Sequence, residues 1–197
     1  MNEIDIGAHD QFFHVRVIVG IVTGLAVARL LSALARAVRP TDRYGRDWLQ
    51  LSWAAFLFLY VVHFWWFEYG LSRTASWQFG AYAFVIGYSA LLYFASAVLL
   101  PEGAGKSNPD ESYVIEIRQW FFALMILMII FDIVDSGMKG RNYFGGLGLE
   151  YQIRQMAMII AAFVAIFVRS VRYHGVFVAA AILSQVFLIF RLYARLT

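Results

Sequence analysis

Cysteine is absent from the chain, which excludes disulfides, thiol chemistry and cysteine-ligated metal sites. Charge is scarce as well: charged residues make up 15% of the sequence, against about 25% in a typical soluble domain. The net charge of +3 is small and scattered, so no nucleic-acid partner is expected. Proline stands only at Pro40, Pro101 and Pro109, between hydrophobic segments or at their ends. The helices should therefore be continuous, which disfavours a transporter built on broken helices.

What the chain has in excess is apolar sequence, 61% of all residues, concentrated in long runs. A helix needs about 20 residues to cross about 30 Å of hydrocarbon, and six runs approach or exceed that length. The sequence therefore predicts an all-α integral membrane protein, a single multi-pass domain (1–197) forming a bundle of six transmembrane helices. A re-entrant hairpin is the alternative for the last two runs, which are the shorter ones. The six predicted helices cover residues 12–38, 48–70, 77–100, 109–136, 150–171 and 174–195.

The topology of the six helices can also be predicted. The first ten residues are acidic and lack the features of a cleavable signal peptide, so the first helix is expected to be a retained anchor. An even number of spans places both termini on one side, here called face A, and two three-helix halves would form an inverted pair. The arginines between the first two spans favour the opposite side, face B, as cytoplasmic. The prediction is a bacterial inner (plasma) membrane protein with both termini outside.

Two helix starts carry capping signals. Asp47 is expected to cap the second helix, with Gln50 in the capping-box position. Asn108, Pro109 and Glu111 are expected to open the fourth helix in the same way.

Small residues recur every four positions in the first helix, at Gly20, Gly24, Ala28 and Ser32. Such a stripe lets helix backbones approach closely in lipid. Packing inside the bundle is the favoured interpretation. The alternative is an interface with a second copy of the chain or with another membrane protein.

Polar residues near face A are the main functional candidates, because an ionisable group in hydrocarbon costs about 2.5–3.5 kcal/mol on insertion scales. Counting along the helices places His63 about two turns inside face A, at the depth of Asp132 and Asp135. Glu68 and Arg191 lie nearer the same face. An ion or proton site formed by these residues is the functional prediction. Interfacial salt bridges, such as either aspartate with Arg191 or Arg154, are the alternative.

Arg29 is the other costly residue, about 12 Å from the face-B end of the first helix. A buried structural role is favoured, with a cationic anion-path or lipid-phosphate site as the alternative. Polar and aromatic groups expected at its depth are Trp53, Tyr93, Ser96, Ser184 and Gln185.

No cofactor and no catalytic residue is predicted, although haem or a metal stays an open alternative. His63 and Glu68 lie roughly 140° apart around their helix, so they do not form a same-face ligand pair. His14 is the other histidine on face A that could serve a haem. The aromatic residues 64–69 are typical of an interfacial belt, and the glycine-rich stretch 137–148 is expected to be a flexible connector.

Three functions fit these observations. The favoured one is a small oligomeric ion- or proton-conducting channel or carrier that uses the face-A residues. The second is a non-catalytic accessory or scaffold subunit of a larger membrane complex. The third is a membrane haem or metal protein or an enzyme, and an enzyme is the less favoured class.

Overall fold

The computed structural model describes residues 3–37, 47–68, 78–101 and 111–193, and all the regular structure in these ranges is helical. Six of the helices are long and apolar enough to cross a membrane, so the prediction of an all-α six-helix membrane bundle is confirmed. The helices are α1 (Glu3–Ala37), α2 (Trp48–Phe67), α3 (Phe79–Leu99), α4 (Tyr113–Met138), α5 (Arg141–Gly146), α6 (Gly148–Phe167) and α7 (Val171–Tyr193).

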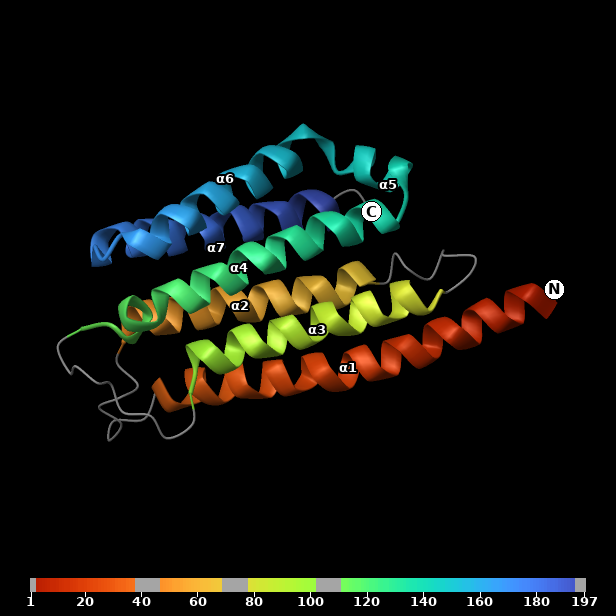
Figure 1. Cartoon of the computed structure of the whole chain (residues 1–197), viewed down its shortest axis with the longest axis horizontal. Coiled ribbons are helices and arrows are strands. Elements are labelled where there is room, and N and C mark those ends of the chain that lie inside the picture. Colours follow the sequence, from red (N-terminus) through yellow and green to blue (C-terminus); the bar gives the residue numbers. More distant parts are fainter. Residues whose placement is uncertain (1–2, 38–46, 69–77, 102–110, 194–197) are drawn as a thin grey trace.

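The six long helices lie side by side and form a closed ring (Figure 1). Around the ring, neighbours pack in the order α1, α3, α4, α6, α7, α2, and α2 also touches α3 and α4. The start of α1 and the end of α7 lie at the same end of the bundle, as six antiparallel spans require (Figure 1). This end is face A, and it also holds the end of α2, the end of α4 and the short helix α5.

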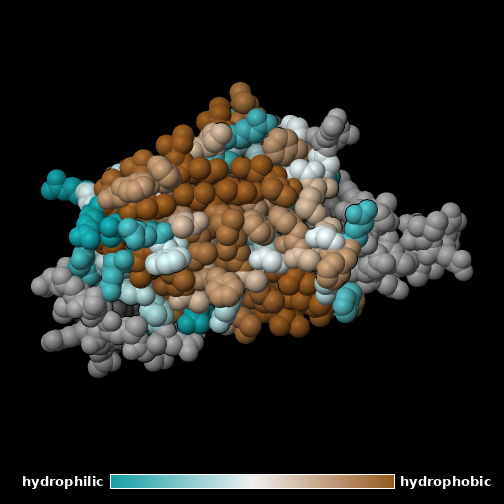
Figure 2. All heavy atoms as spheres, viewed as in Figure 1, coloured by the Kyte–Doolittle hydropathy of each residue, from teal (hydrophilic) through white to brown (hydrophobic). Residues whose placement is uncertain are grey.

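Side chains on the outside of the bundle are apolar, as a lipid environment requires. Figure 2 shows hydrophobic residues across most of the visible middle and hydrophilic residues toward the ends. Large side chains such as Phe79 (81% exposed) and Trp120 (75%) face outward. In water such a surface would drive association, whereas lipid tails cover it without cost. The chain is a multi-pass membrane protein.

The centre of the bundle is closed by packed aromatic rings. Trp53 has no exposed surface, and its ring lies 5.2–5.5 Å from four phenylalanine rings at mainly edge-on angles. Edge-to-face packing of this kind adds stability beyond burial alone. Its four neighbours are Phe56, Phe121, Phe122 and Phe177.

Several predicted helix ends differ from those in the structure. Helix α1 starts at Glu3 rather than near residue 12, because acidic residues favour a helix N-terminus and no proline interrupts the sequence. Helix α4 starts at Tyr113, after Glu111, while Asn108 and Pro109 lie outside the described residues. Helices α6 and α7 contain 20 and 23 residues, enough to span, which disfavours the re-entrant alternative.

The stretch 137–148, which was expected to be a flexible connector, contains the short helix α5. Gly140 (φ 109°) and Gly148 (φ 79°) flank this helix in the left-handed region that side chains with a Cβ avoid. These two glycines allow the chain to leave α4, make one short helix and turn back into α6.

Asp47 caps two helices at face B. Its Oδ1 accepts from the backbone N–H of Leu49 and Gln50, each at 3.2 Å, which confirms its predicted N-cap role in α2. Its Oδ2 accepts from the backbone N–H of Tyr113 at 2.8 Å and from the Ser112 hydroxyl at 2.9 Å. The Gln50 side chain does not complete a capping box, because it donates to the Leu99 carbonyl oxygen at 2.7 Å. One carboxylate therefore joins the starts of α2 and α4.

The small-residue stripe of α1 does not pack inside the bundle, contrary to the favoured prediction. Gly24, Ala28 and Ser32 are exposed on the outer surface. Only Gly20 makes a close internal contact, since a Cβ placed there would lie 2.6 Å from the Trp65 ring. The ring order places α1 against α2 and α3 through other residues, among them Ala26, Leu30 and Ala33.

Candidate functional site: a polar network near face A

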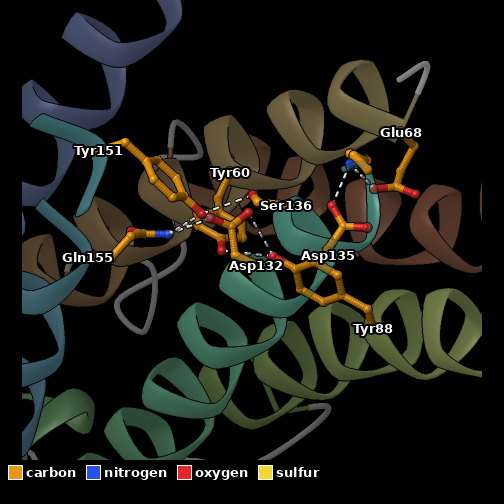
Figure 3. A network of polar contacts seen from close by, with 9 residues as sticks. Tyr60, Glu68, Tyr88, Asp132, Asp135, Ser136, Tyr151 and Gln155 are labelled. Atoms are coloured by element: carbon orange, nitrogen blue, oxygen red, sulfur yellow. Dashed lines mark hydrogen bonds and ion pairs between the residues drawn. The ribbon is translucent and has the colours of Figure 1, made fainter. Parts of the chain in front are cut away.

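Asp132 on α4 is the centre of a hydrogen-bonded network drawn from four helices (Figure 3). Its carboxylate accepts from the Tyr151 hydroxyl at 2.7 Å, from Nε2 of Gln155, and from the Tyr88 hydroxyl at 3.4 Å. The Tyr88 hydroxyl is paired with the Tyr60 hydroxyl at 2.9 Å. All the donors to Asp132 are side chains, so the helices that carry them position the carboxylate through packing.

The same network reaches Ser136, one turn further along α4. The Ser136 hydroxyl lies 3.1 Å from the Tyr151 hydroxyl, and Gln155 Nε2 also donates to Tyr151 at 3.1 Å. Tyr151 and Gln155 are 2% exposed, and both lie on the buried face of α6 together with Met158, Ala162 and Ala165. Buried polar groups satisfied in this way fix the relative rotation of α4 and α6.

Arg154 extends the network to α7 and α2. Its guanidinium donates to the Gln155 side-chain oxygen at 3.1 Å and to the Gln185 side-chain oxygen. The amide nitrogen of Gln185 then faces Nδ1 of His63 at 3.0 Å. Because that amide nitrogen can only donate, His63 accepts at Nδ1 and its imidazole is neutral. His63 is thus linked to Asp132 through three intervening side chains.

A second group, the Lys139 triad, lies beside the Asp132 network and nearer face A. The Lys139 ammonium pairs with Asp135, four residues earlier on α4, and with Oε1 of Glu68 at 3.0 Å. The ammonium also lies 4.1 Å from the centre of the Phe67 ring. Its side chain has no exposed surface, and Glu68 is only 8% exposed. One ammonium therefore serves two buried carboxyl groups.

Glu68 follows the last residue of α2 and lies outside the membrane span. Burial raises the pKa of Glu68 to about 8, and the Asp135 carboxylate adds to the rise while Lys139 opposes it. Burial is the larger cause, and the repulsion from Asp135 is only partly offset by the single ammonium that both carboxyl groups share. A carboxyl group with this pKa titrates close to neutral pH.

Four of the five predicted ion-site residues lie together near face A: His63, Glu68, Asp132 and Asp135. Arg191 does not join them, because it forms an ion pair with Glu150 and donates to the Leu147 carbonyl oxygen at 3.4 Å. The predicted alternative of salt bridges from the aspartates to Arg191 or Arg154 is also incorrect in its partners. Asp135 pairs with Lys139, and Arg154 reaches Asp132 only through Gln155.

Sequence reasoning missed six members of the two groups: Tyr60, Tyr88, Ser136, Lys139, Tyr151 and Gln155. Two signals could have found some of them. Lys139 stands four residues after Asp135, the spacing at which a helix brings opposite charges together. Tyr151 and Gln155 have the same spacing and occupy an otherwise apolar, buried stripe of α6. The tyrosines on α2 and α3 offer no comparable signal.

Arg29 and Gln185 were predicted at matching depth, but the structure separates them. Arg29 donates from Nε to the Leu100 carbonyl oxygen at 3.0 Å and from Nη1 to the Tyr93 hydroxyl at 3.4 Å. Tyr93 was one of its expected neighbours, and Leu100 is the C-terminal cap of α3. Arg29 thus ties α1 to the end of α3, whereas Gln185 lies in the chain from Arg154 to His63.

The remaining candidates concern cofactors and aromatic residues. In the ranges that the structure describes, no three His, Asp or Glu side chains gather as a metal site would require. His14 is exposed and stacks near Tyr82, with 6.4 Å between ring centres. Trp65 and Trp66 face outward, at 41% and 58% exposure, as expected of an interfacial belt.

Comparison with family models, with curated proteins and with solved structures finds no match to this chain. A function is therefore inferred from the geometry and charge of the polar network.

Proposed function

We propose that this membrane protein binds and transfers protons, as a small carrier or channel whose proton site is formed by the Asp132 network and the Lys139 triad. The observation that carries the proposal is a mismatch of charge. Three carboxyl groups, Glu68, Asp132 and Asp135, lie near two basic side chains: Lys139 pairs with Glu68 and Asp135, and Arg154 reaches Asp132 only through Gln155. An unpaired charge in such a place is expensive, so the third carboxyl group binds a cation. The proton is that cation.

The pKa of Glu68 suits this role. At about 8, it allows the carboxyl group to take up and release a proton close to neutral pH. An ordinary glutamate with a pKa near 4.3 would remain ionised there. Glu68 also lies at the face-A end, where water can deliver the proton.

The hydroxyl groups of the Asp132 network can pass a proton further into the bundle. A hydroxyl both donates and accepts, so a row of them relays a proton by successive transfers. Such a row runs from Ser136 through Tyr151, Asp132 and Tyr88 to Tyr60, with oxygen–oxygen separations of 2.7–3.4 Å. Beyond Tyr60 the rings of Phe56 and Trp53 pack in the direction of face B, and this row of hydroxyl groups does not extend past them. This arrangement supports transfer that depends on a conformational change or on assembly into a homo-oligomer.

Proton flux into liposomes tests the proposal. The purified protein is reconstituted with a pH-sensitive dye inside, and a potassium gradient with valinomycin drives proton uptake. Wild-type protein is expected to acidify the lumen faster than empty liposomes, and Glu68→Gln is expected to slow the flux by at least about tenfold. Glu150→Gln is the matched control, because this glutamate is 61% exposed in its side chain and lies outside the triad. Equal flux in wild-type and empty liposomes would refute the proposal.

A scaffold or accessory subunit is the second candidate, supported by the outward stripe Gly24, Ala28 and Ser32 on α1. Small residues on a lipid-facing surface suit close contact with a further helix. The native mass of the complex in mild detergent separates the two candidates. A homo-oligomer agrees with the carrier, and a stable complex with a different membrane protein favours the scaffold.

A further inference from the structure

A groove of about 370 Å³ lies between α1 and the end of α2, away from the polar network. Its walls are apolar except for one cation, Arg16. Both helices approach face A here, since α1 starts at Glu3 and Trp65 is close to the end of α2. The six lining residues are Phe13, Arg16, Val17, Gly20, Ile21 and Trp65.

Gly20 and Trp65 shape the groove. A Cβ at Gly20 would lie 2.6 Å from the Trp65 ring, so a larger residue there would displace the indole from the backbone of α1. The Arg16 guanidinium lies 5.9 Å from the centre of the same ring, at a distance typical of a cation–π contact. The indole therefore forms one wall of the groove and also positions the cation at its mouth.

The cation and the apolar residues of the groove follow one another along α1. Arg16 stands three residues after Phe13, and Val17, Gly20 and Ile21 continue away from the start of the helix. Ile21 lies about 7.5 Å beyond Arg16 along the helix axis. The groove is thus cationic nearer face A and apolar farther from it.

We propose that this groove binds one anionic phospholipid, with its phosphate against Arg16 and one acyl chain along Val17, Gly20 and Ile21. Charge complementarity identifies the occupant. A guanidinium is a strong partner for a phosphate oxygen, and the lining residues include no carboxylate that would compete for it. Basic pockets between membrane helices bind anionic head groups for the same reason. The site is independent of the proposed proton transfer.

Native mass spectrometry of the purified protein tests this site. Phosphatidylglycerol, phosphatidylcholine with the same acyl chains, and soluble glycerol 3-phosphate are added separately. Wild-type protein is expected to retain one phosphatidylglycerol, with weaker binding of phosphatidylcholine and none of glycerol 3-phosphate. Removing one basic contact with the head group should weaken retention roughly fivefold in Arg16→Gln. The matched control is Arg36→Gln, which removes an exposed arginine at the opposite end of α1.

A second variant keeps the test valid if Arg16→Gln unfolds. Val17→Trp fills the apolar part of the groove while leaving the charge in place, and it is expected to lower retention of both lipids. Equal loss in Arg16→Gln and Arg36→Gln would overturn the proposal. So would equal retention of the two lipids, or binding of glycerol 3-phosphate as strongly as the lipid.

Discussion

Two aspartates near opposite ends of the bundle, Asp47 and Asp132, differ in what donates hydrogen bonds to them. Asp47 accepts from three backbone N–H groups and one serine hydroxyl, at the starts of α2 and α4. Asp132 accepts only from side chains, two of which are tyrosine hydroxyls. Backbone donors cannot exchange their role, whereas a hydroxyl can reverse from donor to acceptor. The comparison assigns a structural role to Asp47 and a role in proton relay to Asp132.

The largest expected effect is a difference in proton flux between variants of the two aspartates. Asp132→Asn should lower proton flux in liposomes by about a hundredfold, because a neutral amide cannot accept and release the relayed proton. Asp47→Asn should leave flux per folded molecule unchanged, because Asp47 lies at face B, away from the Asp132 network, although asparagine keeps one acceptor oxygen and can cap only one of the two helices. Both variants remove one carboxylate, so an equal loss of proton flux in the two would contradict the different roles assigned to Asp47 and Asp132.

For stability, in contrast to proton flux, substitution of Asp47 should have a larger effect than substitution of Asp132. Asp47→Ala removes caps from α2 and α4 together, and each lost cap costs about 0.5–2 kcal/mol, so the two together cost roughly 1–4 kcal/mol. Thermal unfolding in detergent measures this change, and Asp47→Asn, which keeps one of the two acceptor oxygens, should lose about half as much. An unfolding free energy unchanged in Asp47→Ala would show that the double cap does not stabilise the fold.

The pH dependence of stability should identify Glu68. Its pKa is about 8 in the folded protein and near 4.3 in an unfolded chain, so the folded state binds the proton more tightly. Between those two values the folded state holds one more proton, and stability falls as pH rises until it levels off above about pH 8. Glu68→Gln should lose this component, so the difference in melting temperature between variant and wild type should grow from pH 5 to pH 8. A constant difference would contradict the assigned pKa.

The smallest expected effect compares two tyrosines. Tyr88→Phe removes the hydroxyl between Tyr60 and Asp132 and should cost about 1 kcal/mol of stability together with a measurable part of the flux. Tyr173→Phe removes a hydroxyl that donates to the Ala161 carbonyl oxygen at 2.8 Å, away from the network. It should cost a similar amount of stability with no change in flux. Loss of flux in both variants would indicate a general packing effect.

Much of the fold could be predicted from the sequence because hydrocarbon thickness sets a minimum length for each apolar helix. The spans around His63 and Asp132 were predicted within a few residues, and both residues lie toward the face-A ends of their helices. Depth counting failed for Gln185, because α7 starts at Val171 rather than 174 and a three-residue error shifts a side chain by about 4.5 Å.

The partners within the site could not be predicted, because they depend on how each helix is rotated. In a soluble bundle, an apolar stripe identifies the inward face of a helix. In lipid the outward face is apolar as well, so the sequence of α2 does not distinguish the side that carries Tyr60 from the side that carries Val62. The same loss of contrast explains why the small-residue stripe with Gly24 was placed inside the bundle and why Arg191 was placed beside the aspartates.

The central claim is that the buried acids near face A hold one exchangeable proton, and infrared spectroscopy tests it most directly. The carbonyl stretch of a protonated carboxyl group is followed from pH 5 to pH 10 in reconstituted protein. The structure predicts one band that disappears with a midpoint near pH 8 in the wild type and in Asp47→Asn, and that is absent in Glu68→Gln. A wild-type spectrum with no protonated carboxyl group at pH 6 would contradict the account.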